Sequence, residues 1–357
     1  MAQKFVRFLS SQGIESAAEK GMENQCQVWV VREEDVERAQ SALENYRANP
    51  NDSTFDIQVP QAGPLKDLGP SSLQAAPIRS RISYRPLTLF LAALASILFL
   101  VQQWQESEVA RPFTEAQLEH VALITPIEEA LLIQTPEPLV KLKHVVEERG
   151  PTAAPLSVPQ VEEILSEAPE FVGAWGSIQE ALNLAPQRKP APFLPEVRAG
   201  QLWRLLTPAL LHGHLLHIGF NLLWLFYLGR HIEQRLGSLR MLGIVLVAAL
   251  ISNVSQYAMS GPLFYGLSGV ICGLGGFIWS RQRIAPWEGY PVPQATLQFL
   301  AAFVLVMIVV ECGIFAAELV HGPLGLGFGI ANTAHVTGGL AGILLGRLPC
   351  MGKRSKL

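Results

Sequence analysis

Six apolar runs with almost no charge constrain this chain more than any other feature. They cover residues 86–104 and about 215–228, 239–258, 267–280, 295–317 and 332–348. A helix of about 20 mostly apolar residues is long enough to cross the hydrocarbon of a bilayer. A soluble helical core of this size would need charged outer faces, but only 16% of the residues are charged. The runs therefore predict an α-helical membrane protein with six transmembrane helices.

The charge that the chain does carry is unevenly distributed. Residues 1–85 hold ten basic and eleven acidic residues, a composition typical of a small soluble domain. Residues 86–200 are acidic and rich in proline after the first run, with amphipathic pieces near 114–133, 138–149 and 159–183. These pieces indicate a helical insertion, with a disordered spacer as the alternative. The net charge of −3 gives no reason to expect a nucleic-acid partner.

Basic residues in the short connections predict the orientation in the membrane. Arginines precede the first run, lie between the second and third, and follow the fourth, and three basic residues close the chain. The connections at about 259–266 and 321–331 contain no lysine or arginine. Because cytoplasmic loops carry an excess of basic residues, we expect both termini in the cytoplasm. The connections after the first, third and fifth runs would then face outward.

The fourth run is too short to reach both membrane surfaces. From Ser268 to Ser280 a helix would be about 20 Å long, against about 30 Å of hydrocarbon. With Arg281 at the cytoplasmic surface, Ser268 must lie below the outer surface, after an irregular stretch that contains Gly261 and Gly266. Irregular backbone is tolerated at membrane depth only where it is buried in protein or lines a wet cavity. The sequence therefore predicts a water-filled cavity with Ser268 at its floor.

Ser268 is the candidate nucleophile, and His335 is the candidate base. Ser268 lies in Gly-Leu-Ser-Gly at the start of a buried helix, whose free N–H groups can stabilise an oxyanion. A serine needs a base, and His335 lies near the same depth at the start of the sixth run, although it could instead cap that helix. Glycines that recur every four residues would allow the two helices to pack closely. These are Gly269 and Gly273 on the fourth run, and Gly338, Gly342 and Gly346 on the sixth.

No aspartate is available to complete a catalytic triad in this region. The last aspartate of the chain is Asp67, and the carboxylates after residue 200 are four glutamates, of which Glu311 lies within the fifth run. We expect Glu311 to face the cavity or a polar partner, although an intramembrane carboxylate is a functional candidate by default. A Ser268–His335 dyad is therefore the simplest arrangement.

Polar residues at the start of the second run are candidates for an oxyanion pocket. His217 and Asn221 are four residues apart, share one helix face and could donate hydrogen bonds. Together with His212 and His214 they also invite interpretation as a metal site. However, the spacing does not place three histidines on one helix face, and no cysteine or aspartate joins them. We therefore expect neither a metal nor another cofactor.

In combination, these residues resemble the rhomboid family of intramembrane serine proteases. The matching positions are Trp203-Arg204, His212, His217, Asn221, Gly-Leu-Ser-Gly at 266–269 and Ala-His-Val-Thr-Gly at 334–338. The resemblance implies that Ser268 is the nucleophile and His335 the general base. It also implies an oxyanion pocket formed by the Ser268 backbone N–H with the His217 and Asn221 side chains.

The same resemblance assigns roles to other parts of the chain. Trp203, Arg204, His212, Glu233, Arg235 and Asn332 would form a structural polar network. The fifth helix would be a lateral gate, and the glycine-rich residues 322–329 would cap the site. Two positions depart from the bacterial members of the family. Cys272 stands where a tyrosine stacks on the catalytic histidine, and Tyr265 stands where a glycine is usual.

The predicted fold is a six-transmembrane-helix rhomboid core with a small N-terminal α/β cytosolic domain and an external helical insertion after the first span. The resemblance extends to that N-terminal domain, where a strand-like stretch lies between two helices. The expected segments are 1–48 for the N-terminal domain, 49–85 for a linker, 86–104 for the first transmembrane helix, 105–200 for the external loop and insertion, 201–348 for the catalytic core, and 349–357 for a cytoplasmic tail.

We expect an intramembrane serine endopeptidase that cleaves transmembrane or juxtamembrane segments of membrane proteins. Its partners would be transmembrane protein substrates and the lipid bilayer, and its location the bacterial inner (plasma) membrane. Two alternatives stay open. A non-catalytic rhomboid-like protein that binds membrane clients would usually lack the serine or the histidine. A transporter or channel would show buried charges along a path and an inverted repeat.

Overall fold

The structure is a computed structural model that describes the chain in several stretches. These are residues 2–14, 16–20, 26–30, 35–50, 52–55, 86–110, 124–150, 154, 156–322 and 331–352. The chain divides into two compact units, Met1–Ser83 and Tyr84–Leu357. Most of the expected linker, nearly all of the expected cap and the closing basic residues lie outside the described residues.

The first unit contains two helices and a pair of strands. In chain order these are α1 (Ala2–Ser11), β1 (Ser16–Lys20), β2 (Cys26–Val30) and α2 (Val36–Ala48), followed by a 3-10 helix, η3 (Ser53–Phe55). The strands pair antiparallel, and buried Phe5, Leu9, Ile14, Tyr46 and Phe55 form the core. The sequence pattern did not indicate β1, because alanine, glutamate and lysine are weak strand formers and β1 depends on pairing with β2.

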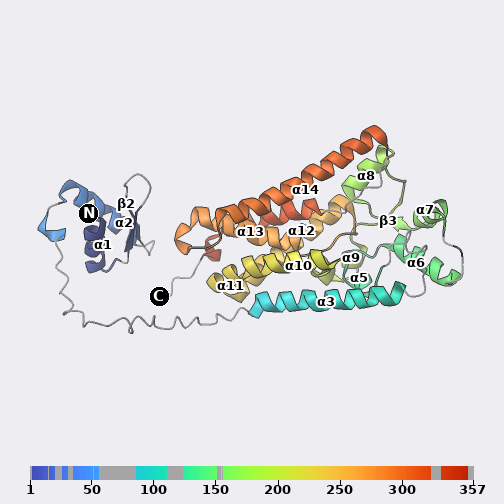
Figure 1. The fold of residues 1–357 in the computed structure, drawn as a ribbon, viewed down its shortest axis with the longest axis horizontal. Helices are drawn as coiled ribbons and strands as arrows, with labels where there is room; N and C mark the ends of the chain where they lie inside the picture. Colours follow the sequence, from blue (N-terminus) through green and yellow to red (C-terminus); the bar gives the residue numbers. More distant parts are fainter. Residues whose placement is uncertain are drawn as a thin grey trace, which may run out of the picture. The chain divides into compact units, whose positions relative to one another are not determined.

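The second unit contains the long apolar helices, which run alongside one another (Figure 1). They are α3 (Pro86–Ala110), α10 (Leu215–Trp224), α12 (Ser238–Ser260), α13 (Ser268–Ile284), α14 (Gln294–His321) and α15 (Asn332–Gly346). Through a π-helical turn, η6 (Leu225–Gly229), α10 continues into α11 (Arg230–Leu236). Among the described helices, α3, α12 and α14 are long and apolar enough to cross a membrane.

Between α3 and α10 lies an insertion whose described residues form mostly helices. Its elements are α5 (Pro126–Leu131), α6 (Glu137–Arg149), α7 (Val158–Glu167), β3 (Pro169–Glu170), α8 (Gly173–Ala181), β4 (Lys189–Pro190) and α9 (Pro195–Arg198). The two short strands pair parallel to each other. The disordered-spacer alternative is therefore wrong for these residues, whereas residues 111–123 lie outside the described stretches.

Short 3-10 helices join these elements. They are η4 (Leu202–Leu205) and η5 (Thr207–Leu210) before α10, η7 (Pro286–Glu288) after α13, and η8 (Pro349–Met351) after α15.

The first apolar helix was predicted to end at Trp104, but α3 continues to Ala110 through polar residues. Polar side chains do not end a helix by themselves, so the apolar boundary and the helix boundary differ here.

The fourth apolar helix also extends beyond its predicted end at Ser280 and stops at Ile284. Its extra turn carries Arg281, whose guanidinium pairs with Glu288 and donates to the carbonyl oxygen of Gly346. These partners satisfy a buried arginine and allow the helix to continue. At 1.5 Å per residue α13 is about 26 Å long, still shorter than the hydrocarbon of a typical bilayer.

The backbones of α13 and α15 are in direct contact. A Cβ atom added at Gly338 would lie 2.1 Å from the carbonyl oxygen of Gly269, and one added at Gly342 would lie 1.8 Å from that of Gly273. Such distances are too short for a real Cβ, so glycine is required at Gly338 and Gly342. The predicted close packing is confirmed, and it brings the starts of the two helices together.

Polar contacts at the far end of the helices fix the start of α3 and the turn that follows α13. The Glu233 carboxylate accepts hydrogen bonds from the backbone N–H groups of Leu87 and Thr88, at 2.8 and 2.9 Å, and so caps the start of α3. Arg235 instead donates to the carbonyl oxygens of Glu288 and Gly289. Glu233 and Arg235 were expected in one network, but Glu233 holds the start of α3 and Arg235 holds the turn that contains η7.

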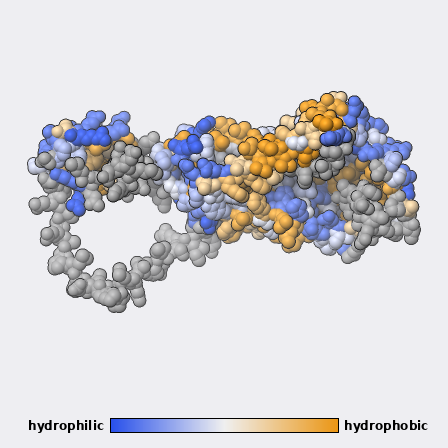
Figure 2. Space-filling view, turned by 45° about the horizontal axis from the view of Figure 1, so that its top comes forward, coloured by the Kyte–Doolittle hydropathy of each residue, from blue (hydrophilic) through white to orange (hydrophobic). Residues whose placement is uncertain are grey.

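The surface of the second unit is apolar over much of its length. Figure 2 shows hydrophobic residues over α14 and the helices beside it, with hydrophilic residues gathered toward the two ends of this unit. Exposed apolar side chains on α14 include Phe299, Leu305, Val309 and Leu319. A continuous apolar surface of this kind is typical of a face that contacts lipid. The second unit is therefore a helical membrane domain.

Candidate active site

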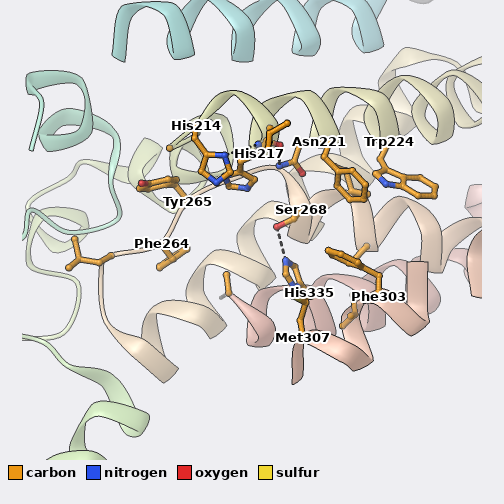
Figure 3. A pocket seen from close by; sticks show the side chains of 18 of the residues that line it. His214, His217, Asn221, Trp224, Phe264, Tyr265, Ser268, Phe303, Met307 and His335 are labelled. Carbon is orange, nitrogen blue, oxygen red and sulfur yellow. Dashed lines mark hydrogen bonds between the residues drawn. The ribbon is translucent and has the colours of Figure 1, made fainter. Parts of the chain in front are cut away.

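Ser268 and His335 are hydrogen-bonded neighbours. Ser268 is the first residue of α13, and His335 lies in the first turn of α15. The Nε2 atom of His335 lies 2.8 Å from the Oγ atom of Ser268, as Figure 3 shows. The glycine contacts between the helices permit this distance. The imidazole therefore faces the serine hydroxyl.

The turn before Ser268 depends on Gly266. Its φ of +124° is a conformation that residues with a side chain rarely adopt, and its N–H donates to the carbonyl oxygen of Pro208 at 3.0 Å. A Cβ atom at this position would lie 2.7 Å from Nε2 of His217. The backbone just before the serine is thus held against α10. As the first helical residue, Ser268 also has a backbone N–H with no partner inside its helix.

His217 and Asn221 lie on α10 and share the face that lines this site. Asn221 is buried, and its Nδ2 donates to the carbonyl oxygen of His217 at 3.0 Å. His214 caps the helix, because its Nδ1 accepts from the backbone N–H of His217 at 3.1 Å. The Asn221 side chain is therefore held by the backbone of α10, and the backbone of His217 is held by the cap of that helix.

A cavity of about 900 Å³ is lined by all four residues predicted for the site, which are Ser268, His335, His217 and Asn221. The prediction of a cavity at the start of the fourth helix is therefore confirmed. Most of its other lining side chains are apolar, as is usual for a binding cavity.

The side of the cavity between α10 and α14 is closed by aromatic rings. The centroids of Phe220 and Phe303 are 5.5 Å apart, and those of Trp224 and Phe299 are 6.3 Å apart. Aromatic contacts at these distances contribute roughly 1 kcal/mol each. On this side of the cavity, α10 and α14 are therefore joined in part by these two pairs of aromatic rings.

The two positions that depart from the bacterial pattern both line the cavity. Cys272 is buried one turn after Ser268. The hydroxyl of Tyr265 packs against Gly213, where an added Cβ atom would lie 2.8 Å from it. Both side chains are thus part of the cavity wall, and the serine–histidine contact is made in their presence.

Other residues of the predicted polar network form hydrogen bonds next to the cavity. Trp203 Nε1 donates to the carbonyl oxygen of Ala130 at 3.3 Å, and Arg204 Nη1 donates to that of Leu132 at 2.7 Å. The two side chains thereby attach the end of α5 to the start of the helical core. His212 is fully buried beside the site.

Glu311 has a polar partner, as expected. The Asn332 side chain donates a hydrogen bond to its carboxylate, which links α14 to the start of α15.

The histidines near the site pack against each other, and the ring centroids of His212 and His217 are 5.0 Å apart. Within the described stretches, no three His, Cys, Asp or Glu side chains are grouped so that they could hold a metal ion.

Two polar residues beside the cavity were not anticipated from the sequence. Gln102 is buried in α3, where its Oε1 accepts from the backbone N–H of His212 at 3.3 Å and its Nε2 donates to Glu128 at 2.8 Å. Glu128 forms a capping box with Thr125 at the start of α5 and lines the cavity. Two signals in the sequence could have found them. Gln102 is an amide at the end of an apolar run, and Thr125 and Glu128 form the Thr-x-x-Glu pattern of a capping box.

Comparison with known proteins matches both units. Residues 199–351 match the family described as "Rhomboid domain", and residues 1–61 match "Cytoplasmic N-terminal domain of rhomboid serine protease". The chain is 39% identical over 166 residues to "Rhomboid protease GlpG homolog" of Cronobacter sakazakii. The aligned region is 45% of this chain and 57% of the relative. It is 38% identical over 145 residues to "Rhomboid protease GlpG" of Yersinia pestis, and this aligned region is 41% of this chain and 47% of the relative. The chain thus spans about half the length of these curated relatives.

Proposed function

The chain belongs to the rhomboid family, and from this premise we propose that it is an intramembrane serine endopeptidase that uses a Ser268–His335 dyad. The observation that carries the proposal is the 2.8 Å contact between Ser268 Oγ and His335 Nε2 inside a cavity. Both relatives are named rhomboid proteases, which supports the same activity.

In the proposed reaction Ser268 Oγ attacks the carbonyl carbon of the cleaved peptide bond. His335 Nε2 takes the hydroxyl proton and then gives it to the leaving amine, and a water molecule hydrolyses the acyl-enzyme with the same histidine as base. The other ring nitrogen, Nδ1, has no hydrogen-bond partner among the described residues. The geometry therefore supports a dyad without a carboxylate as third member.

The oxyanion would be stabilised by the Ser268 backbone N–H together with the side chains of His217 and Asn221. The position of Ser268 at the start of α13 supports this role, because a helix N-terminus carries unsatisfied N–H groups and partial positive charge. The close approach of Gly266 to His217 supports it as well, since it keeps the α10 side chains beside the serine.

We also propose six transmembrane helices: α3, α10 with η6 and α11, α12, α13, α14 and α15. Both termini would lie in the cytoplasm of a bacterium, with the chain in the inner membrane. Residues 1–48 would form a cytosolic α/β domain, 49–85 a linker and 349–357 a cytoplasmic tail. The match of residues 1–61 to a cytoplasmic rhomboid domain supports this orientation.

Substrates would be transmembrane proteins that enter sideways from the bilayer between α10 and α14. The aromatic contacts between these helices contribute roughly 1 kcal/mol each and can be opened without disturbing α13 and α15, which supports such a path. Substrates should contain helix-weakening residues, because a stable helix keeps its carbonyl groups hydrogen-bonded and away from Ser268. Small residues at the cleaved position would fit best.

The test is cleavage of a single-span substrate by the purified full-length protein in proteoliposomes. Cleavage should occur, and it should be lost in Ser268→Ala and His335→Ala. Ser280→Ala is the matched control, because Ser280 is buried in the same helix but does not line the cavity. Cleavage that persists in Ser268→Ala would overturn the proposal. Binding of the substrate without cleavage by the unaltered protein would instead favour the client-binding alternative.

A further inference from the structure

The cavity around Ser268 contains one carboxylate that the proposed chemistry does not use. Glu128 lies on α5, is partly exposed and lines the cavity. The other described lining residues are apolar side chains, glycine, histidines and uncharged polar groups, with no lysine, arginine or aspartate among them. Apart from any charge on the histidines, Glu128 therefore sets the charge of this cavity.

The hydrogen bonds to Glu128 hold its carboxylate without neutralising it. One oxygen accepts from Gln102 Nε2 at 2.8 Å. The other accepts from the backbone N–H of Thr125 at 2.8 Å and from its hydroxyl at 2.9 Å. All three donors are uncharged, and the described ion pairs do not include Glu128. A negative charge that is fixed beside apolar walls is less screened than one in open water.

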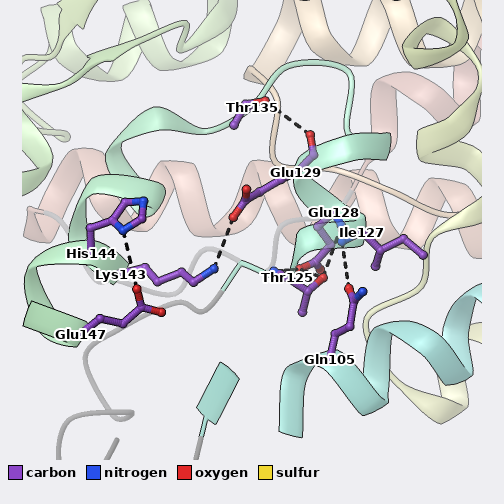
Figure 4. A network of polar contacts seen from close by, with 9 residues as sticks. All are labelled: Gln105, Thr125, Ile127, Glu128, Glu129, Thr135, Lys143, His144 and Glu147. Atoms are coloured by element: carbon purple, nitrogen blue, oxygen red, sulfur yellow. Dashed lines mark hydrogen bonds and ion pairs between the residues drawn. The ribbon is translucent and has the colours of Figure 1, made fainter. Parts of the chain in front are cut away.

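The neighbouring glutamate differs in this respect. The Glu129 carboxylate pairs with Lys143 of α6 at 3.4 Å, and Figure 4 shows its side chain reaching away from α5 toward that lysine. Lys143 is thus paired with Glu129. The two adjacent glutamates form a natural pair for comparison, one facing the cavity and one already paired.

We propose that Glu128 is a specificity-determining residue that favours substrates with a lysine or arginine on the outer aqueous side of the cleaved bond. This inference rests on the proposed function. The long stems of lysine and arginine can lie along an apolar wall while the cation reaches a carboxylate. A glutamate at the same substrate position would be repelled, so the cavity selects by attraction and by repulsion together.

The experiment compares substrates that differ only in one outer juxtamembrane residue, which is lysine, glutamine or glutamate. The position is varied over several residues from the cleaved bond, and kcat/KM is measured for each substrate. We expect the unaltered protein to prefer lysine over glutamate by about tenfold at the best position. Glu128→Gln should bring this ratio close to one, and Glu128→Lys should invert it. Glutamine keeps an oxygen that can accept from Thr125, so α5 retains its cap.

Glu129→Gln is the matched control and should leave the ratio unchanged. A ratio that stays high in Glu128→Gln, or that falls equally in Glu129→Gln, would overturn the inference. Raising the salt concentration should narrow the ratio, since a charge effect is screened. Equilibrium binding of the lysine and glutamate substrates to the Ser268→Ala protein gives a second readout without turnover. Preferential binding of the lysine substrate would support Glu128 even if cleavage failed, and equal binding would contradict it.

Discussion

The packing of α15 against α13 differs from the packing of α14 beside them. Against α15 the backbones touch, because Gly338 and Gly342 leave no room for a side chain. The packing of α14 is looser, because Leu297, Leu300 and Glu318 are the buried residues of this 28-residue helix and many of its apolar side chains are exposed. The first arrangement fixes the distance between Ser268 and His335. The second leaves α14 free to move more easily than α15, as the proposed lateral entry of substrates would need.

The strongest way to break this contrast is to add a side chain at the tight interface. Gly342→Val places atoms where even a Cβ would lie 1.8 Å from the Gly273 carbonyl oxygen. We expect a loss of about 3 kcal/mol in the free energy of unfolding and loss of cleavage, because the helices must separate. Thermal unfolding in detergent and the cleavage rate measure the two effects.

Two glycine variants serve as controls for this prediction. At Gly339 an added Cβ would have its nearest neighbour at 3.8 Å, and at Gly313 on α14 it would have none within 4 Å. Gly339→Ala and Gly313→Ala should therefore be tolerated and gain helix propensity. If Gly342→Val does not fold, Gly342→Ala takes its place. Equal behaviour of Gly342→Ala and Gly339→Ala would contradict the claim that the interface is tight.

A smaller effect is expected where α14 is tied to α15. Asn332→Ala removes the donor to the Glu311 carboxylate and leaves an acceptor unsatisfied within the helical core. We expect a destabilisation of about 1–2 kcal/mol, measured by thermal unfolding. In Glu311→Gln the side chain can still accept from Asn332, so this variant should lose less stability. The opposite order would show that the charge of Glu311, and not its hydrogen bond, matters.

The smallest effect is expected near the C-terminal end of α14. Trp175 on α8 of the insertion packs against Phe315 at 4.5 Å between ring centroids. The start of α8 is itself fixed on α12, where a Cβ at Gly173 would lie 2.6 Å from the Met259 backbone. Trp175→Ala removes about 1 kcal/mol of contact, and we expect cleavage of a transmembrane substrate to rise by up to about fivefold.

The control for this last prediction is Ile178→Ala, since Ile178 is an exposed residue of the same helix. It should leave the initial rate of cleavage unchanged. An unchanged rate in Trp175→Ala, with unchanged thermal stability, would show that α8 does not restrain α14.

The sequence predicted the parts of the site that depend on local patterns. The start of α13 at Ser268 followed from the glycine-rich stretch before it, and the contact with His335 followed from the spacing of glycines on two helices. The helix ends were less predictable. Arg281 continues α13 because Glu288 pairs with it, a contact that no local pattern reveals.

Contacts between distant segments could not be predicted from one sequence. Gln102 joins Glu128 to the backbone of His212, and these three residues come from α3, the insertion and the loop before α10. Nothing in the local sequence of any one of them indicates the other two. The same holds for the wall between α10 and α14, whose aromatic residues are spaced like ordinary apolar helix residues.

The most direct test of the account is covalent labelling of the full-length protein by a fluorophosphonate, with the adduct located by peptide mapping. An activated serine reacts with this reagent, whereas ordinary serines do not. The account predicts an adduct on Ser268 that is absent in Ser268→Ala and slowed by about a hundredfold or more in His335→Ala. Labelling of another residue, or equal labelling of Ser268 when His335 is replaced, would contradict it.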